Sequence, residues 1–125
     1  VACCTDAREP VIRRAWLKPG AHVSSVGGTF GPELDPETVA AGKVFVEWRG
    51  AATNAPPAGA HELQGLDAST ITEVGEVLAG TKPGRTSDHD ITIYKSTGHA
   101  VEDAATASLV YARALAEGAG RRLPL

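Results

Sequence analysis

The chain has 125 residues, of which 42% are hydrophobic and 22% are charged, and its formal net charge is -3. This length and composition suit one globular domain with a modest core. No more than two Lys or Arg residues are adjacent, which argues against a nucleic-acid-binding or anionic-membrane-binding surface. No apolar run approaches the roughly 18 residues that a membrane-spanning helix needs.

The first five residues are predicted to form the end of a buried strand, although strands rarely open a chain, and the sequence contains no methionine. We therefore expect the C-terminal piece of a larger protein; the alternative is a short processed protein whose first strand begins at residue 1. Cys3 and Cys4 lie in this strand, and neighbouring cysteines rarely pair. We expect two buried, reduced thiols and a reducing compartment, the cytoplasm. No partners at ligand spacing accompany them, so no metal site is expected.

Two further strands and a helix are predicted in the first half of the chain. Residues 21–26 form a strand that runs into Gly27 and Gly28. Asp35 is placed to cap a short helix, with proline at its first position, that ends near Gly42. Residues 43–47 form the next strand, which is apolar on both faces and therefore suits a sheet covered on both sides.

The second half of the chain begins with residues 50–66, which are predicted to form a long, irregular surface excursion with one helical turn near residues 60–66. Ser69 or Thr70 is expected to cap a helix over residues 71–78, closed by Gly80. Residues 91–94 read as a strand and residues 99–117 as a long amphipathic helix. Its apolar face would consist of Val101, Ala105, Leu109, Ala112 and Leu115. Strands alternate with helices, which predicts an α/β fold with a parallel sheet.

Ligands of open α/β sheets bind outside the carboxyl ends of strands. This rule selects Thr5, the Gly27-Gly28 pair and residues 95–98. Because Gly27 and Gly28 carry no Cβ, they permit close approach of a flat ring or a phosphate, but they equally suit a tight turn with positive φ. The chain contains no six-residue dinucleotide-binding glycine fingerprint.

Residues 95–98 join the last strand to the long helix, whose N-terminus offers unpaired N–H groups to an anionic or amide ligand. Ser96 or Thr97 is placed to cap this helix, so ordinary capping is the alternative explanation of the motif. The four histidines show neither metal-ligand nor triad spacing. His99 is the one nearest this candidate site, and we expect it to face solvent or cap the helix rather than to act in catalysis.

Several blocks of the sequence resemble the ornithine cyclodeaminase/mu-crystallin family. They are residues 1–5, 8–11, 16–23, 26–27, 33–35, 73–80, 83–85 and 91–103. The last block, Ile-Thr-Ile-Tyr-Lys-Ser-Thr-Gly-His-Ala-Val-Glu-Asp, is the most specific, and residues 50–66 are the weakest part of the resemblance.

The resemblance implies that residues 1–95 are the C-terminal part of a Rossmann-type NAD(P)-binding domain. Residues 96–125 would be a helical segment that returns to a dimerisation and substrate domain. It implies a homodimer that uses NAD or NADP and acts on a small imino or amino acid, with no nucleic-acid or membrane partner. The favoured reaction is reduction of ketimines or cyclic imine carboxylates. The alternatives are ornithine cyclodeamination and a non-catalytic, mu-crystallin-like binding protein or remnant.

The resemblance also assigns site residues. The cofactor would contact Thr5, Val26, Gly27, Gly28 and Ser96, and the substrate would lie near Thr97 and Thr29. Thr29 stands where ornithine cyclodeaminases carry a catalytic aspartate. Unlike a carboxylate, a threonine hydroxyl does not ionise near neutral pH and so does not act as a general acid or base. The family's phosphate loop and its substrate-holding lysine and arginine have no counterpart here. No catalytic residue is therefore assigned, and the isolated chain is expected to bind NAD(P) poorly and to be inactive.

Overall fold

The computed structural model describes residues 1–121 and 123. Within them, a single five-stranded sheet has the order β1-β2-β5-β3-β4, and every pairing is parallel. The strands are β1 (Ala2–Cys3), β2 (His22–Ser25), β3 (Lys43–Val46), β4 (Thr72–Glu73) and β5 (Thr92–Lys95). The predicted parallel α/β class is confirmed. Lys95 at the end of β5 lies opposite Ser25 of β2 and Val46 of β3, so the carboxyl ends of the three central strands meet at one edge.

Short helices and turns connect the strands. They are α1 (Pro36–Ala41), α2 (Gly50–Thr53), α3 (Val74–Leu78), α4 (Ala100–Glu117) and the 3-10 helices η1 (Arg14–Trp16), η2 (His61–Leu63) and η3 (Ala68–Thr70). The predicted start of α1 is confirmed, because the Asp35 carboxylate accepts a hydrogen bond from the Thr38 N–H and Pro36 occupies the first turn. The predicted helical turn near residues 60–66 corresponds to η2. The prediction that residues 50–66 form a surface excursion is only partly right, because Ala51, Ala52, Ala60 and Leu63 are buried.

The helix predicted over residues 71–78 is wrong in its first part. Ile71 is buried and Thr72 pairs with Phe45 of β3, because β-branched side chains pack well along a sheet edge. The helix starts only at Val74, where Glu73 and Glu76 form a reciprocal capping box. Neither Ser69 nor Thr70 caps it. Gly80, with φ of 72°, follows its end as expected.

The core lies around the central strands, where Val23, Val46 and Ile93 are completely buried. The prediction of two buried thiols is only half right. Cys3 is buried, and burial, followed by the nearby Glu33 carboxylate, raises the pKa of its thiol. Cys4 is exposed, because successive side chains of a strand point to opposite faces.

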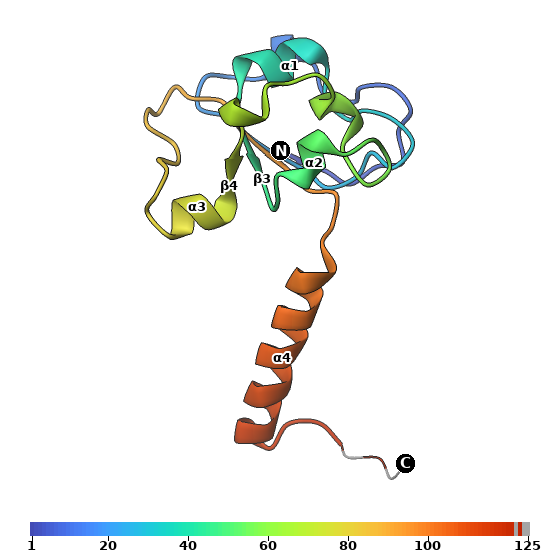
Figure 1. The fold of residues 1–125 in the computed structure, drawn as a ribbon, viewed down its shortest axis with the longest axis vertical. Helices are drawn as coiled ribbons and strands as arrows, with labels where there is room; N and C mark the ends of the chain where they lie inside the picture. The colour runs from blue at the N-terminus through green and yellow to red at the C-terminus, as the bar shows by residue number, and fades with distance from the viewer. Residues whose placement is uncertain (122, 124–125) are drawn as a thin grey trace.

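The long helix α4 projects away from the body of the molecule (Figure 1), and none of its residues is buried. Neither Ser96 nor Thr97 caps it, contrary to expectation. The cap is His99, whose Nδ1 accepts a hydrogen bond from the Val101 N–H at 3.4 Å. The apolar residues Leu109 and Leu115 are 68% and 48% exposed. The assignment of this segment to a dimerisation domain stays a prediction.

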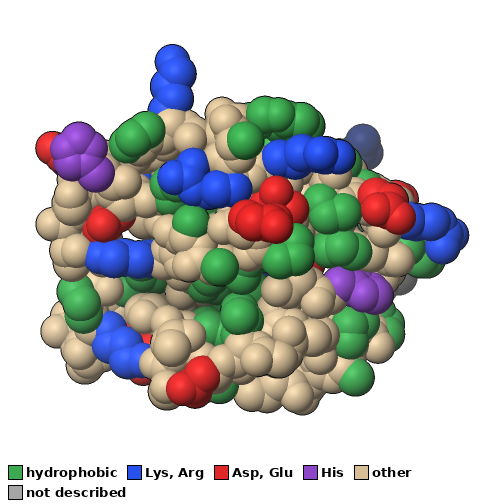
Figure 2. Space-filling view, turned by 90° about the horizontal axis from the view of Figure 1, so that it is seen from above, with side chains coloured by type: hydrophobic (Ala, Val, Ile, Leu, Met, Phe, Trp, Pro, Cys, Tyr) green, Lys and Arg blue, Asp and Glu red, His purple; other side chains and the backbone are tan. Residues whose placement is uncertain are grey.

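The surface of the body carries charges of both signs. On the face that Figure 2 shows, Lys and Arg side chains alternate with Asp, Glu and hydrophobic groups. Across residues 1–121 and 123, no helix combines the length and the apolar character that crossing a membrane requires.

Replacement of Ile93 by alanine is expected to lower the free energy of unfolding by about 2–5 kcal/mol, because it leaves a cavity in the central strand. Ile93 is completely buried, whereas Leu78 on α3 is 83% exposed. Leu78→Ala is therefore the matched control and should change stability by no more than about 0.5 kcal/mol. Urea denaturation of both variants measures the difference, and equal effects would contradict this placement of the core.

Candidate functional site

A small cavity of about 40 Å³ opens at the carboxyl ends of β2 and β5. Its wall combines three segments of the chain: Val26, Gly27, Gly28 and Thr29; Pro57, Gly59 and Ala60; and Lys95, Ser96 and Thr97. Every residue predicted for the site therefore lines it except Thr5. The Thr5 carbonyl oxygen lies just behind the wall and accepts a hydrogen bond from the Gly28 N–H at 3.0 Å.

The middle segment of the wall, residues 57–60, was not predicted. It belongs to the irregular stretch between α2 and η2, whose Pro-, Gly- and Ala-rich sequence carries no periodic signal. Its position depends on packing against α2, with a hydrogen bond from the Ala60 N–H to the Ala51 carbonyl at 2.7 Å.

The protein's own packing requires both glycines. A Cβ on Gly27 would lie 2.3 Å from the Thr5 carbonyl oxygen and 2.5 Å from a carboxylate oxygen of Glu33. Gly28 has φ of 89°, and a Cβ there would lie 2.9 Å from the Gly31 carbonyl oxygen. The tight-turn interpretation of the glycine pair therefore holds, and the bare backbone of the same turn forms part of the cavity wall.

A cluster of buried charged side chains includes one residue of this wall, Lys95, and two that lie behind it. It consists of Glu33, Lys95 and Glu62, whose side chains are 0%, 1% and 2% exposed. Lys95 Nζ lies 3.1 Å from Glu62 Oε1 and 3.8 Å from Glu33 Oε2. Sequence reasoning missed this cluster, although a lysine that ends an apolar strand was a usable signal, because a lysine is almost never fully buried without a partner.

The Glu33 carboxylate accepts four hydrogen bonds. Its Oε1 accepts from the Thr5 N–H at 2.7 Å and the Thr5 hydroxyl at 2.8 Å. Its Oε2 accepts from the Ser25 hydroxyl at 2.6 Å and the Gly27 N–H at 3.0 Å. Burial acts to raise the pKa of Glu33, but the hydrogen bonds from Ser25, Thr5 and Gly27 outweigh it, so the pKa lies below its ordinary value. The charged form of Glu33 thus ties the ends of β1 and β2 together.

The opposite side of the cavity is ordered by β3 and the residues after it. Glu47 Oε1 accepts hydrogen bonds from the Thr97 N–H at 2.6 Å and the Thr97 hydroxyl at 3.1 Å. The Trp48 indole N–H lies 3.4 Å from the same hydroxyl, and the Trp48 ring meets the His99 ring edge to face with centroids 4.9 Å apart. These contacts hold the turn that precedes α4, whereas α4 itself contributes no residue to the cavity wall.

A wider groove of about 360 Å³ adjoins the cavity, since Thr29 and Pro57 line both. Phe30, Pro56 and His61 complete it, and His61 Nε2 lies 3.3 Å from the Thr29 carbonyl oxygen. Thr29 therefore stands between the cavity and open space, where a ligand in either would meet it.

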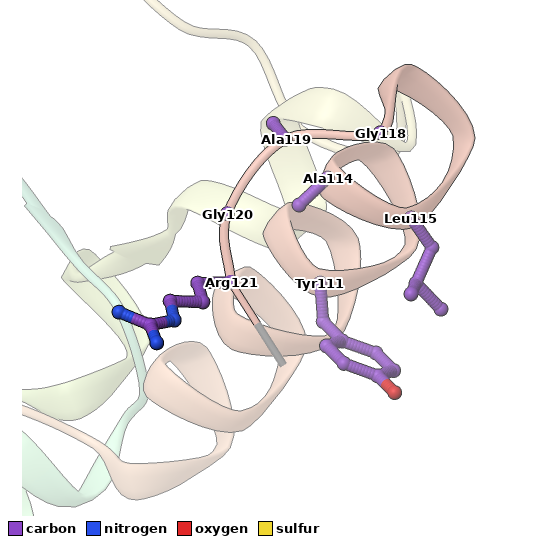
Figure 3. Close-up of a pocket in the computed structure, with 7 residues that line it drawn as sticks. All are labelled: Tyr111, Ala114, Leu115, Gly118, Ala119, Gly120 and Arg121. Carbon is purple, nitrogen blue, oxygen red and sulfur yellow. The ribbon is translucent and has the colours of Figure 1, made fainter. Parts of the chain in front are cut away.

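A separate hollow of about 490 Å³ lies at the far end of α4. Figure 3 shows its residues: Arg121 extends to one side while Tyr111 and Leu115 point to the other, so polar groups do not converge there. It contains none of the predicted site residues. No group of three or more His, Cys, Asp or Glu side chains within residues 1–121 and 123 is arranged to hold a metal ion.

A parallel α/β sheet with a glycine-walled cavity at its carboxyl edge is the arrangement in which open α/β proteins bind their ligands. The chain belongs to the ornithine cyclodeaminase/mu-crystallin family, whose sequence model matches residues 1–118. The predicted resemblance is confirmed.

Several relatives support this membership. The chain is 35% identical to an alanine dehydrogenase of Archaeoglobus fulgidus over 95% of its own length, and 39% identical to the ketimine reductase mu-crystallin of Mus musculus over 86%. A solved structure of Thermococcus litoralis Δ(1)-pyrroline-2-carboxylate reductase, in complex with NADH and L-proline, matches 98% of the chain with a TM-score of 0.81 and 38% identity. The chain spans only 38%, 33% and 39% of these three proteins, respectively.

Replacement of Gly27 by alanine is expected to destabilise the protein by at least about 2 kcal/mol, because the added methyl group overlaps the Thr5 backbone and Glu33. Gly75 is the matched control, since a Cβ there meets nothing within 4 Å and alanine is favoured in a helix. Thermal unfolding compares the two variants. Equal melting temperatures would show that the Gly27 turn is looser than described.

Glu33 is expected to contribute stability that depends on pH. Because folding lowers its pKa from the ordinary value of 4.5, the contribution is complete above that pH and is lost as the pH falls through the lowered folded-state pKa. Glu33→Gln should therefore cost about 3 kcal/mol at neutral pH, and the difference from wild type should shrink below pH 4.5.

Urea unfolding at a series of pH values measures this difference. Glu117→Gln, at an exposed carboxylate, is the control and should show almost no change at any pH. A deficit for Glu33→Gln that stays constant into acid would contradict the assignment of an ionised Glu33.

Proposed function

We propose that the protein to which this chain belongs is an NAD(P)-dependent oxidoreductase that reduces the C=N bond of small imino acids such as ketimines or cyclic imine carboxylates. The observation that carries the proposal is the cavity itself. It joins the backbone of residues 26–29 to residues 95–97 at the strand ends where α/β proteins bind ligands. Relatives of the chain include a reductase bound to NADH and L-proline and a ketimine reductase.

The residues present fit one end of a dinucleotide. A side chain at Gly27 or Gly28 would collide with the protein, so this wall stays bare and permits close approach of a flat nicotinamide ring. Pockets that enclose a whole ligand have volumes of roughly 300–1,000 Å³, far more than the 40 Å³ found here. Because residues 1–121 and 123 also lack a glycine-rich phosphate loop, we expect the isolated chain to bind NAD(P) poorly.

When bound, the cofactor would supply the hydride, and the chain's own residues would position the reactants. Gly27, Gly28 and Ser96 would lie beside the nicotinamide, with Thr5 behind them. Thr97, whose hydroxyl is oriented by Glu47, and Thr29 would face the substrate. A threonine hydroxyl at position 29 can hydrogen-bond a substrate but cannot act as a general acid or base near neutral pH. This difference favours reduction over deamination.

The exposed apolar face of α4 supports a second element of the proposal. Leu109 and Leu115 remain largely in water within the described residues, and such a face normally packs against another element. We propose that α4 returns to a dimerisation and substrate domain of a homodimer in the cytoplasm. One relative of known structure is an archaeal alanine dehydrogenase dimer with bound NAD.

Ornithine cyclodeamination is the second candidate, because a probable ornithine cyclodeaminase from Bordetella pertussis matches the fold with a TM-score of 0.75 and 32% identity. It requires a proton-exchanging group, and Thr29 does not supply one. A non-catalytic binding protein of the mu-crystallin type is the third candidate.

The test uses the full-length protein with pyrroline-2-carboxylate or piperideine-2-carboxylate and NADH or NADPH, followed by cofactor absorbance. Imine-dependent oxidation of the cofactor is expected. Thr29→Asp should lower kcat/KM about tenfold, since a carboxylate beside the substrate carboxylate repels it. Thr53→Asp, at an exposed position, should leave kcat/KM unchanged.

Formation of proline from ornithine without imine reduction would favour the cyclodeaminase instead. Cofactor binding with neither reaction would favour the binding protein.

A further inference from the structure

Lys95 donates two hydrogen bonds and forms an ion pair with Glu62. Its Nζ lies 3.0 Å from the Ser25 hydroxyl oxygen, 2.7 Å from the Gly27 carbonyl oxygen and 3.1 Å from Glu62 Oε1. The Lys95 side chain, at the end of the central strand β5, therefore contacts the end of β2, the glycine turn and η2.

Gly27 is held from both sides. Its N–H donates to Glu33 and its carbonyl accepts from Lys95. The two peptide groups that flank Gly27 are thus fixed by two buried, charged side chains, and Gly27 and Lys95 both line the cavity. Loss of Glu33 or Lys95 would therefore leave one of these peptide groups without its charged partner.

Stability alone does not explain why this location is charged. Removing three ions from water is costly, and well-packed apolar residues often serve stability as well or better. Charged hydrogen bonds differ from apolar contacts because they have strict directional requirements. Charged hydrogen bonds are therefore suited to holding a peptide group in one orientation.

We propose that Lys95, Glu33 and Glu62 are positioning residues that fix the peptide groups around Gly27 in the cavity wall, and thereby set the affinity and placement of the dinucleotide. Glu62 anchors Lys95 from the side of residues 57–60, so the cluster also joins the third wall segment to the other two. The identity of the ligand rests on the function proposed above; the fixing of Gly27 does not.

The first test measures dinucleotide binding in the full-length protein. Lys95→Met keeps an unbranched side chain of similar length but removes the ammonium group. Its dissociation constant for NADH or NADPH, from fluorescence titration, should rise at least tenfold. Ile71→Ala is the matched control: Ile71 is equally buried but does not line the cavity, so this variant should lose melting temperature and keep its dissociation constant within twofold. An equal rise of the dissociation constant in both variants would show that the cluster acts only through overall stability, and it would overturn the proposal.

The second test does not need a ligand. Amide hydrogen exchange, resolved at single residues in the same protein, should be at least tenfold faster at Gly27 in Lys95→Met, while the Val44 amide of β3 should change less than twofold. Glu62→Gln, which keeps the size of the side chain and one acceptor oxygen, should show a smaller change in the same direction. It replaces Lys95→Met as the decisive variant if the latter does not fold.

The two tests distinguish failure of the proposed function from failure of the positioning role. Absence of NADH and NADPH binding by the wild-type protein would refute the proposed function, and exchange at Gly27 would still decide the positioning role. Unchanged Gly27 exchange in the variants would overturn the positioning role whatever the protein binds. Faster exchange with an unchanged dissociation constant would overturn the role in ligand placement.

Discussion

The structure depends on one buried carboxylate that accepts four hydrogen bonds. Glu33 receives two from Thr5 and one each from Ser25 and Gly27, and so joins the segments that follow β1 and β2. Burying a charge is costly unless hydrogen bonds compensate for it. That condition fixes where the two strands end relative to each other, and with them the wall of the cavity.

Lys95 extends this constraint across the sheet. It stands at the end of the central strand, where the parallel register brings it opposite Ser25. Its ammonium group donates hydrogen bonds to Ser25 and Gly27 and forms an ion pair with Glu62. The cavity is consequently a product of strand order. β5, late in the sequence, lies between β2 and β3, and this crossover brings residues 95–97 beside residues 26–29. The function proposed for the site depends on that juxtaposition.

The long helix α4 is a contrasting case. Its amphipathic pattern is clear in the sequence and its bounds are close to those predicted, yet no described residue of it is buried. The body of the molecule is organised without it (Figure 1). In the assembly proposed for the full-length protein its apolar face would be covered, whereas the cavity wall described above is formed without α4.

The sequence by itself determined the parallel α/β class, the cap at Asp35, the glycine turn after β2 and the long final helix, because each depends on local signals such as periodicity, capping residues and missing side chains. It also indicated most residues of the cavity wall, through the rule for strand ends and the family resemblance.

The tertiary structure alone decided the rest. The Glu33–Lys95–Glu62 cluster comes from contacts between residues far apart in the sequence, and the wall segment at residues 57–60 from packing against α2; no periodic pattern encodes either. The same reason explains the error at Ile71 and Thr72, where pairing with β3 outweighs the tendency to form a helix. The exposure of Cys4 has a local cause, because it follows Cys3 directly and side chains alternate between the two faces of extended backbone.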